Sequence, residues 1–333
     1  MEVLVLGHEE VRALLPMAEC VDVMIDVLSA RARGEAQMPL RQVMWLPDRH
    51  GALASMPAYV SPDGLGAKLV SAFPGNSQTP YESHQGAVVL FEADHGSVEA
   101  ILDAATVTAV RTAAVSAAAT RTLARPEAAA VAILGTGRQA ALHAEAMVTV
   151  RAVRRIRLWG RSRERAEALA GRLERTLGLP VEAVGDVRTA LVGADIVCTT
   201  TSSTEPILPG RLLPEGCHIN AAGASVPGYR ELDSEAIARS RLYVDARESA
   251  ASESDELRIA HAEGRIGPDH VLGELGELFL ERVAGRRDAA EITLFESFGL
   301  AVEDIAAAGL VVAAARARGI GSRVEFGAMR TSG

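Results

Sequence analysis

Residues 132–141 read Ala-Ile-Leu-Gly-Thr-Gly-Arg-Gln-Ala-Ala, and this stretch decides the fold. The apolar residues before the first glycine predict a buried strand, and the pattern after the second glycine predicts a helix over 139–150. Gly135 permits a tight turn, and Gly137 lets the main chain approach a pyrophosphate. Ala140, in place of a third glycine, still permits close packing of helix against strand. Because the free N–H groups at a helix start attract phosphate, the stretch predicts a dinucleotide-binding turn. The cofactor residues expected from it are Gly135, Thr136, Gly137, Arg138 and Gln139.

Outward from this turn, expected strands and helices alternate along the chain. The strands are expected over 129–134, 156–159, 181–184 and 196–200, and the helices over 139–150 and 163–177. Alternation of this kind is typical of a parallel sheet with helices on both faces. We therefore expect an α/β protein with a Rossmann-type doubly wound sheet in residues 125–300. Thr200, at the end of the last of these strands, is a further expected cofactor residue.

The turn after the second strand indicates which dinucleotide binds. An NAD site usually carries Asp or Glu at this point, to bind the ribose 2′-hydroxyl. Here the turn reads Gly160-Arg161-Ser162-Arg163, without a carboxylate. It is either a solvated basic turn or a site for a 2′-phosphate. In the second case, Arg161 can form an ion pair with the phosphate and Ser162 can donate a hydrogen bond to it. Arg138 can add a second charge. We favour the second interpretation, and so expect NADPH.

The residues before position 125 follow a different pattern. A helix is expected over 17–32, followed by short strands and then an Ala-rich helix over 104–123. The expected strands cover 42–46, 52–59, 67–73, 87–92 and 97–102. Pro126 favours a linker at 125–127, and the apolar helix over 301–317 is expected to pack back on the first domain. The expected division is therefore an α+β domain of residues 1–124 and 301–333, with the Rossmann domain between.

Composition excludes several classes of protein. The net charge of -9 argues against nucleic acid as the main partner. No apolar run approaches the roughly 18 residues of a membrane helix, and residues 1–10 lack a basic segment, so we expect a cytoplasmic protein without a membrane partner. The three cysteines form no CxxC pair, and no His, Asp or Glu cluster has metal-ligand spacing, so no metal is expected.

Lys68 is the single lysine of the chain, among 34 basic residues of which the other 33 are arginine. It is either a chance survivor of a strong bias toward arginine or a residue whose role a guanidinium cannot fill. A buried lysine can lower its pKa and exchange protons, whereas an arginine stays charged in a protein. We favour a functional role for Lys68.

Further motifs lie in separate expected elements along the chain. They are Met38–Arg41, Met56–Tyr59, Ala67–Val70, Ser83–Gln85, Arg111–Ala117, Gly135–Ala140, His218–Ser225, Glu231–Asp233 and Thr293–Asp304. With these motifs in this order, the chain resembles the ornithine cyclodeaminase/mu-crystallin family over nearly its full length.

The resemblance implies a homodimer in which the first domain and the final helix bind the substrate and the partner subunit. It also implies that Arg41, Lys68 and Arg111 converge on an amino or imino acid. Arginine offers a planar fork for a carboxylate, and Lys68 can hold a carboxylate oxygen or pass a proton to the substrate nitrogen. The Ala-rich surroundings of Arg111 indicate a buried helix. His84 is either a second proton carrier or a loop histidine with a structural hydrogen bond.

This chain departs from the family pattern at one residue, and that residue bears on which of the family's reactions the chain is expected to catalyse. Ornithine cyclodeaminases and related alanine dehydrogenases carry an Asp two residues before a Pro-Gly, where this chain has Ser225 before Pro227-Gly228. A serine without a partner is a poor general base at neutral pH, so cyclodeamination is disfavoured. The turn resembles that of mu-crystallin and the ketimine reductases, which use NADPH. Ser225 is expected to touch the substrate or the nicotinamide side.

We therefore expect an NADPH-dependent reductase of cyclic ketimine carboxylates, either Δ1-piperideine-2-carboxylate or Δ1-pyrroline-2-carboxylate, giving L-pipecolate or L-proline. The alternatives are a cyclodeaminase, an alanine-type amino-acid dehydrogenase and a non-catalytic NADPH-dependent binding protein. Ring size, direction of reaction and the role of Glu296, where relatives often carry Lys, stay open. The acidic stretch 248–256 is interpreted as a solvated loop or helix start, and His218 as a residue that orders the backbone near Gly223.

Overall fold

The apolar run before Gly135 forms strand β8 (Ala130–Leu134) in a computed structural model that describes residues 2–61 and 64–327. The chain divides into two units, one of Met1–Arg111 with Leu300–Gly333 and one of Thr112–Gly299. The division falls inside helix α3 (Ala104–Leu123), whereas we expected a boundary at the end of this helix. Residues 1, 62–63 and 328–333 of the expected first domain lie outside the described residues.

The unit of residues 112–299 is built on an eight-stranded sheet in which every neighbouring pair is parallel. Its order is β10 (Val181–Ala183), β9 (Arg155–Trp159), β8, β11 (Ile196–Thr199), β12 (His218–Ala221), β15 (Ile292–Glu296), β13 (Ser240–Val244) and β14 (Val271–Glu274). From β8 the chain proceeds to β9 on one side, and β11 lies on the other. In sheets of this type, ligands usually bind beside such a reversal of strand order, at the carboxyl ends of the strands.

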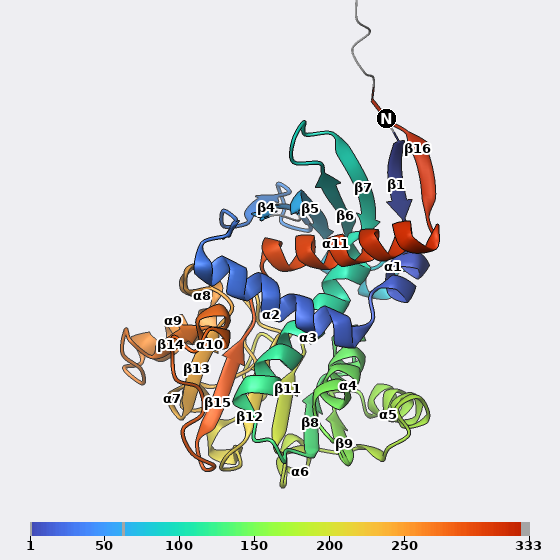
Figure 1. The fold of residues 1–333 in the computed structure, drawn as a ribbon. Helices are drawn as coiled ribbons and strands as arrows, with labels where there is room; N and C mark the ends of the chain where they lie inside the picture. Colours follow the sequence, from blue (N-terminus) through green and yellow to red (C-terminus); the bar gives the residue numbers. More distant parts are fainter. Residues whose placement is uncertain (1, 62–63, 328–333) are drawn as a thin grey trace, which may run out of the picture. The chain divides into compact units, whose positions relative to one another are not determined.

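Helices pack against this sheet as the alternating pattern predicts (Figure 1). They are α4 (Arg138–Val150), α5 (Arg163–Leu177), α6 (Val187–Leu191), α7 (Ser234–Ala238), α8 (Arg247–Glu253), α9 (Asp255–Ala262) and α10 (Leu275–Phe279). Helix α4 contacts β8 and β11, while α5 contacts β9 and β10. The strands β8 and β15 are buried along their whole length, and in β8 this burial explains the continuous apolar run of the sequence. The predicted α/β fold with a parallel sheet is confirmed.

The other unit contains a mixed eight-stranded sheet. Its order is β16 (Ser322–Glu325), β1 (Glu2–Leu6), β7 (Val98–Asp103), β6 (His84–Phe91), β5 (Gly64–Ala72), β4 (Ala52–Val60) and β2 (Ala36–Gln37), with β3 (Gln42–Trp45) paired to β4. Strands β3 to β7 form an antiparallel meander. The sequence did not indicate β16, because all four of its residues are exposed and show no apolar alternation.

Three helices accompany this mixed sheet, together with the first part of α3: α1 (His8–Leu14), α2 (Met17–Arg33) and α11 (Ala301–Arg318). Helix α11 lies against β4, β5 and β6 and against α2 (Figure 1). Its apolar residues, such as Val302, Ile305 and Val311, are buried there, which explains a helix that is too apolar to be solvated alone. The first turn of α11 also carries two buried acids, Glu303 and Asp304.

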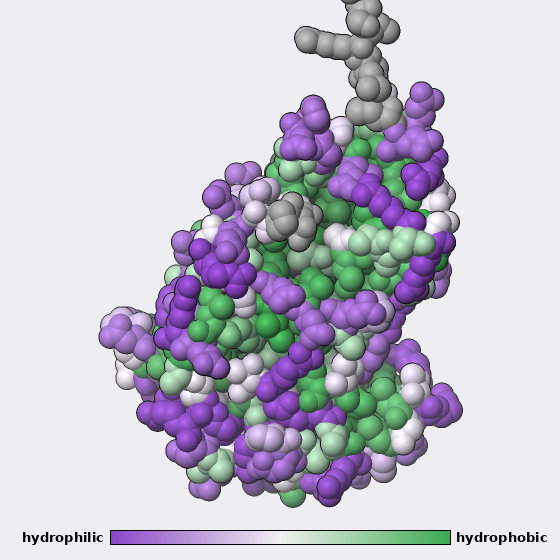
Figure 2. Space-filling view, in the orientation of Figure 1, coloured by the Kyte–Doolittle hydropathy of each residue, from purple (hydrophilic) through white to green (hydrophobic). Residues whose placement is uncertain are grey.

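The surface of the described residues mixes polar and apolar groups. Figure 2 shows hydrophilic residues over much of one face, with apolar residues visible among them. Within residues 2–61 and 64–327, no helix has both the length and the apolar character needed to span a bilayer.

Candidate functional site

Lys68 lies on β5 with only 3% of its surface exposed. Its Nζ is 2.6 Å from Oδ2 of Asp304 and donates a hydrogen bond of 3.3 Å to Oγ1 of Thr108. Burial lowers the pKa of Lys68 to about 8; the carboxylate of Asp304 opposes this change, and the charge of Arg111 adds to it. A lysine with such a pKa can both hold and release a proton near neutral pH.

Arg111, on α3, is buried beside the same carboxylate. Its Nε donates to Oδ1 of Asp304 over 2.9 Å, and its Nη1 donates to Oε2 of Glu303 over 2.8 Å. Burial alone would raise the pKa of Asp304, but Arg111 and Lys68 outweigh it and hold this pKa below its ordinary value. The expected burial of Arg111 is therefore confirmed, at 4% exposure, and two carboxylates compensate its charge.

Arg41 and His84 lie within electrostatic reach of Lys68. Arg41 immediately precedes β3 and is half-buried, and its charge contributes to the low pKa of Lys68. His84 is the first residue of β6, where burial and then the positive Lys68 lower its pKa. Its Nδ1 lies 3.2 Å from Oγ of Ser83. Four of the five expected catalytic residues thus gather in one unit.

Glu303 and Asp304 are the members of this cluster to which sequence reasoning gave no role. They stand in a motif that carries the family resemblance, but the motif alone does not say what they bind. The available signal was electrostatic: a buried Arg111 needs a compensating carboxylate. An adjacent acidic pair at the start of an otherwise apolar helix was a candidate for that partner.

The glycine-rich turn has the geometry of a phosphate cradle. Gly135 has φ +144°, and a Cβ there would lie 2.4 Å from Oγ1 of Thr200, so only glycine fits. Gly137 immediately precedes α4, and a Cβ on it would meet nothing within 4 Å. The space around Gly137 is therefore open at the start of a 13-residue helix, where a pyrophosphate can approach the main chain. Arg138 and Gln139 are the first two residues of that helix.

The turn after β9 adjoins this cradle. A Cβ on Gly160 would lie 2.4 Å from Cγ2 of Thr136, so the two turns touch. The neighbouring Arg161 is exposed, and Oγ of Ser162 accepts a hydrogen bond of 3.3 Å from the N–H of Arg165, which makes Ser162 the N-cap of α5. An exposed guanidinium beside a helix start suits a phosphate, and the residues present fit a dinucleotide.

Ser225 lies in the loop after β12, in the same unit as the glycine-rich turn. Glu231 fixes the start of this loop by accepting hydrogen bonds from the N–H of Gly223 (2.9 Å) and from Oγ1 of Thr201 (2.7 Å). Burial raises the pKa of Glu231 to about 7. The expected catalytic residues are therefore distributed over both units, with Ser225 in one and Arg41, Lys68, His84 and Arg111 in the other.

The sequence left two interpretations of the acidic stretch 248–256, a solvated loop or a helix start, and the structure confirms the second. The stretch forms α8 and the start of α9, and several of its side chains are buried because the helices pack against the carboxyl edge of the sheet. Oε1 of Glu256 accepts from the N–H of Glu231 (2.5 Å) and of Leu232 (2.8 Å). Glu296, at the end of β15, accepts from Oγ of Ser254 over 2.5 Å. Burial raises the pKa of Glu296 to about 8, and burial with the charge of Glu296 raises that of Glu256.

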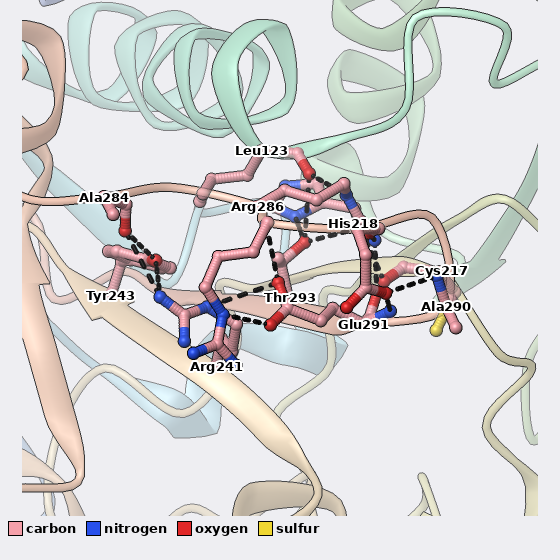
Figure 3. A network of polar contacts seen from close by, with 12 residues as sticks. Leu123, Cys217, His218, Arg241, Tyr243, Ala284, Arg286, Ala290, Glu291 and Thr293 are labelled. Atoms are coloured by element: carbon pink, nitrogen blue, oxygen red, sulfur yellow. Dashed lines mark hydrogen bonds and ion pairs between the residues drawn. The ribbon is translucent and has the colours of Figure 1, made fainter.

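His218 is buried and contacts two polar side chains. Its Nδ1 lies 3.0 Å from Oγ1 of Thr293 and its Nε2 lies 3.2 Å from Oδ1 of Asn220 (Figure 3 shows the contact with Thr293). His218 is the first residue of β12, and these two partners lie on β15 and β12 themselves, before the turn at Gly223 begins. Burial lowers the pKa of His218 to about 3, and the side chain is neutral at physiological pH.

A cavity of about 610 Å³ near the amino-terminal ends of the strands is lined by several arginines. Two of these arginines hold the main chain in place, as their hydrogen bonds show. Arg286 donates to the carbonyls of Leu123 (2.7 Å) and Cys217 (3.2 Å) and to Oγ1 of Thr293 (2.9 Å), as Figure 3 shows. Arg151 donates to three carbonyls in the last turn of α3 and just after it. These cations cap the helix end, where positive charge is stabilising.

Among the described residues, no group of three His, Cys, Asp or Glu side chains could hold a metal.

Comparison with known proteins places this geometry in context. The family model described as "Ornithine cyclodeaminase/mu-crystallin family" matches residues 1–319. The ketimine reductase mu-crystallin of Mus musculus is 41% identical over 84% of this chain and 85% of its own length.

Two solved structures are similar over almost the whole chain. The Δ1-pyrroline-2-carboxylate reductase of Thermococcus litoralis, in complex with NADH and L-proline, has a TM-score of 0.94 and 32% identity, over 97% of this chain and 100% of that one. An archaeal alanine dehydrogenase dimer with bound NAD has a TM-score of 0.92 and 30% identity, over 98% and 100%.

Proposed function

The chain belongs to the ornithine cyclodeaminase/mu-crystallin family, and from this premise we propose that it is an NADPH-dependent reductase of cyclic ketimine carboxylates. The substrates proposed are Δ1-piperideine-2-carboxylate and Δ1-pyrroline-2-carboxylate, with L-pipecolate and L-proline as products. An oxidoreductase acting on carbon–nitrogen bonds is supported by the named activities of its relatives, a ketimine reductase and a pyrroline-carboxylate reductase.

The observation that carries the proposal is the buried cluster around Lys68. A 2-imino carboxylate presents one negative carboxylate and one basic nitrogen. Arg41 and Arg111 supply two guanidinium groups near Lys68, and an arginine binds a carboxylate through two parallel hydrogen bonds. Lys68, with a pKa near 8, can donate a proton to the substrate nitrogen or hold a carboxylate oxygen. The two arginines proposed to bind the carboxylate and the lysine proposed to supply the proton thus belong to one cluster.

The reaction needs little more than correct placement of these groups. A bound nicotinamide supplies the hydride, and the imine carbon receives it. The chain's residues hold the substrate by its carboxylate, keep the imine carbon at a fixed position and manage the proton at nitrogen. Ser225 is proposed to contact the substrate or the nicotinamide side without acting as a base, and His84 is proposed as a second proton carrier.

The preference for NADPH rests on the turn after β9. It offers Arg161 and Ser162 where an NAD site usually has a carboxylate. The Thermococcus relative was solved with NADH, so the family resemblance by itself does not select between the two cofactors. The positive charge of Arg161 favours a cofactor with a 2′-phosphate.

We also propose a homodimer, because one face of the mixed sheet is apolar and exposed. The residues Met44, Leu53, Tyr59, Leu65 and Leu69 are between 36% and 60% exposed. Register places them on the same face, since Met44 pairs with Leu53 and Tyr59 with Leu65, and this face is opposite to that of Lys68. An exposed apolar patch of this kind is typical of a protein interface. The archaeal alanine dehydrogenase relative is a dimer.

The alternatives differ from the proposal at identifiable residues. Cyclodeamination and alanine-type dehydrogenation belong to relatives that carry an Asp at the position of Ser225. A non-catalytic binding protein would not require a buried lysine with its own carboxylate partner. Ser225 thus disfavours the first pair, and the Lys68–Asp304 contact disfavours the last.

The test is the loss of NADPH absorbance with each cyclic imine, run beside NADH and beside ornithine with NAD. We expect rapid oxidation of NADPH with at least one imine, slower oxidation of NADH and no ammonia from ornithine. Ammonia release from ornithine would contradict the argument from Ser225. If no imine is reduced, the proposed function is wrong.

A further inference from the structure

Asp304 contacts two of the proposed catalytic groups through its two oxygen atoms. Oδ2 lies 2.6 Å from Nζ of Lys68, and Oδ1 accepts a hydrogen bond of 2.9 Å from Nε of Arg111. The side chain of Asp304 is completely buried. A single carboxylate therefore connects the proton source to the guanidinium that is proposed to bind the substrate.

The position of Asp304 in the fold makes this contact rigid. It lies in the first turn of α11, where the helix dipole stabilises negative charge. The adjacent Glu303 closes the turn, because its Oε2 accepts from the N–H of Leu300 over 3.2 Å. Lysine has a flexible four-carbon stem, so the orientation of its ammonium group depends on what holds it. Here the fixed carboxylate of Asp304 provides that contact.

The negative charge of Asp304 also affects whether Lys68 keeps its proton. Burial favours the neutral amine of Lys68, and the nearby Arg111 and Arg41 favour it too. Asp304 is the group that opposes all three, because an opposite charge stabilises the ammonium ion. Without it, a buried lysine beside two arginines would lose its proton well below the ordinary pKa of a lysine.

We propose that Asp304 is a positioning residue of the reductase site, which holds Lys68 as an ammonium ion with one oxygen and fixes the Arg111 guanidinium with the other. This inference rests on the proposed function for its catalytic meaning. The contact itself, and its effect on the proton of Lys68, can be measured without turnover.

Glu303 provides a matched control. It is an adjacent acid of the same helical turn, equally buried, and it contacts Arg111 through Nη1 at 2.8 Å. The largest charge effects on the pKa of Lys68 are those of Asp304, Arg111 and Arg41, and Glu303 is not among them. His84 on the neighbouring strand β6 also faces the charge of Lys68, and it is unchanged in both variants. Glu303→Gln therefore removes a carboxylate that contacts Arg111 but not Lys68. Asp304→Asn removes a carboxylate that contacts both Arg111 and Lys68.

The single lysine of this chain allows a direct experiment on the full-length protein. Labelling with [13C]lysine gives one side-chain signal, that of Lys68, whose chemical shift follows its protonation. We expect a midpoint near pH 8 in the wild type, and a midpoint lower by about 1–3 units in Asp304→Asn. Glu303→Gln should move it by a smaller amount. An unchanged midpoint in Asp304→Asn, or an equal shift in both variants, would overturn the proposal.

The wild-type protein offers a second measurement that does not depend on whether Asp304→Asn folds. With [13C]aspartate, one carboxyl signal should shift with the same midpoint as Lys68, because its ion partner loses a charge there. If no aspartate carboxyl follows that midpoint, the pairing is wrong.

Activity then tests the catalytic meaning. In the direction of reduction, the rate should decline as Lys68 loses its proton, so Asp304→Asn should move this decline to lower pH by the shift seen for the lysine signal. Glu303→Gln should instead raise KM and leave the decline in place. A decline that does not move in Asp304→Asn, although the lysine signal has moved, would contradict a positioning role. If the wild type reduces no imine at all, the proposed function fails and the NMR result still decides the contact.

Discussion

At the residue scale, the proposed chemistry depends on Lys68. Its sequence signal was its isolation among arginines, and the structure adds the physical reason: a buried group beside Asp304 whose pKa lies near 8. An arginine could make the same ion pair but could not give up a proton. The partners Glu303 and Asp304 could not be assigned from the sequence, because Arg111 lies 192 and 193 positions before them and the contact depends on packing of α3 against α11.

Lys68→Met tests this residue directly. Methionine fills a similar volume without a proton, so kcat for imine reduction should fall by about 10²–10⁴-fold. The affinity for NADPH, measured by its fluorescence on binding, should stay within about two-fold, since the glycine-rich turn is in the other unit. Lys68→Arg keeps the charge and should also be slow. An active Lys68→Arg protein would show that Lys68 only holds the carboxylate.

Arg161 sets the cofactor preference if our interpretation of the turn is correct. Arg161→Gln should lower kcat/KM for NADPH by about 10–100-fold, as expected for one lost hydrogen bond to a charged group, and leave that for NADH within about two-fold. Arg163→Gln is the control, because Arg163 is equally exposed but pairs with Glu167 at 2.7 Å. An equal loss with both cofactors would contradict a role in binding the 2′-phosphate.

At the scale of elements, the carboxyl edge of the parallel sheet contains an unusual group of buried acids. Glu296 ends β15, while Glu256 begins α9 and binds the main chain at Glu231 and Leu232. Within the described residues, one carboxyl oxygen of Glu296 and one of Glu256 have no hydrogen-bond partner. The two acids repel each other when both are ionised, which favours a proton on one of them.

Glu296→Gln should therefore stabilise the protein at high pH. The pKa of Glu296 is raised from 4.5 to about 8 in the folded state, so the folded protein keeps a proton that the unfolded chain has released between these pH values. Stability of the wild type falls as pH rises through this window. The gain from the substitution should be near zero at pH 4.5 and about 1–3 kcal/mol at pH 8, measured by urea unfolding. Glu248→Gln, on the exposed side of α8, should change nothing; a gain from Glu296→Gln that is independent of pH would contradict the account.

Some elements could be predicted from the sequence and others could not. The buried strand β8 and the helix α4 have strong periodic patterns and a glycine-rich turn between them, and both lie where expected. The sequence left the region of α8 and α9 as either a solvated loop or a helix start, because Ser and Glu are common in both. The burial of these helices depends on hydrogen bonds that Glu256 and Ser254 make to residues far away in the chain.

At the scale of the whole molecule, the residues proposed to bind the cofactor and most of those proposed to bind the substrate lie in different units. One contains the parallel sheet with the dinucleotide cradle and Ser225, and the other contains the Lys68 cluster. The sequence indicated two domains and a final helix belonging to the first. It did not indicate that the division falls inside α3, because the helical pattern continues through Arg111 and Thr112 without a break.

The apolar face of the mixed sheet makes a prediction at this scale. Leu53→Glu places a charge at the centre of that face and should shift the protein from dimer to monomer at micromolar concentration, measured by sedimentation velocity. Val192→Glu, at an exposed apolar residue of the other unit, should leave the dimer intact. A wild type that sediments as a monomer would contradict the proposed homodimer.

The most direct measurement follows the hydride itself. Wild-type protein is given each cyclic imine with NADPH carrying deuterium on one or the other face of C4, and the product is analysed by mass spectrometry. The account predicts L-pipecolate or L-proline with one deuterium at C2 from one of the two labelled cofactors. Product without deuterium from either cofactor, or ammonia formed from ornithine in place of imine reduction, would contradict it.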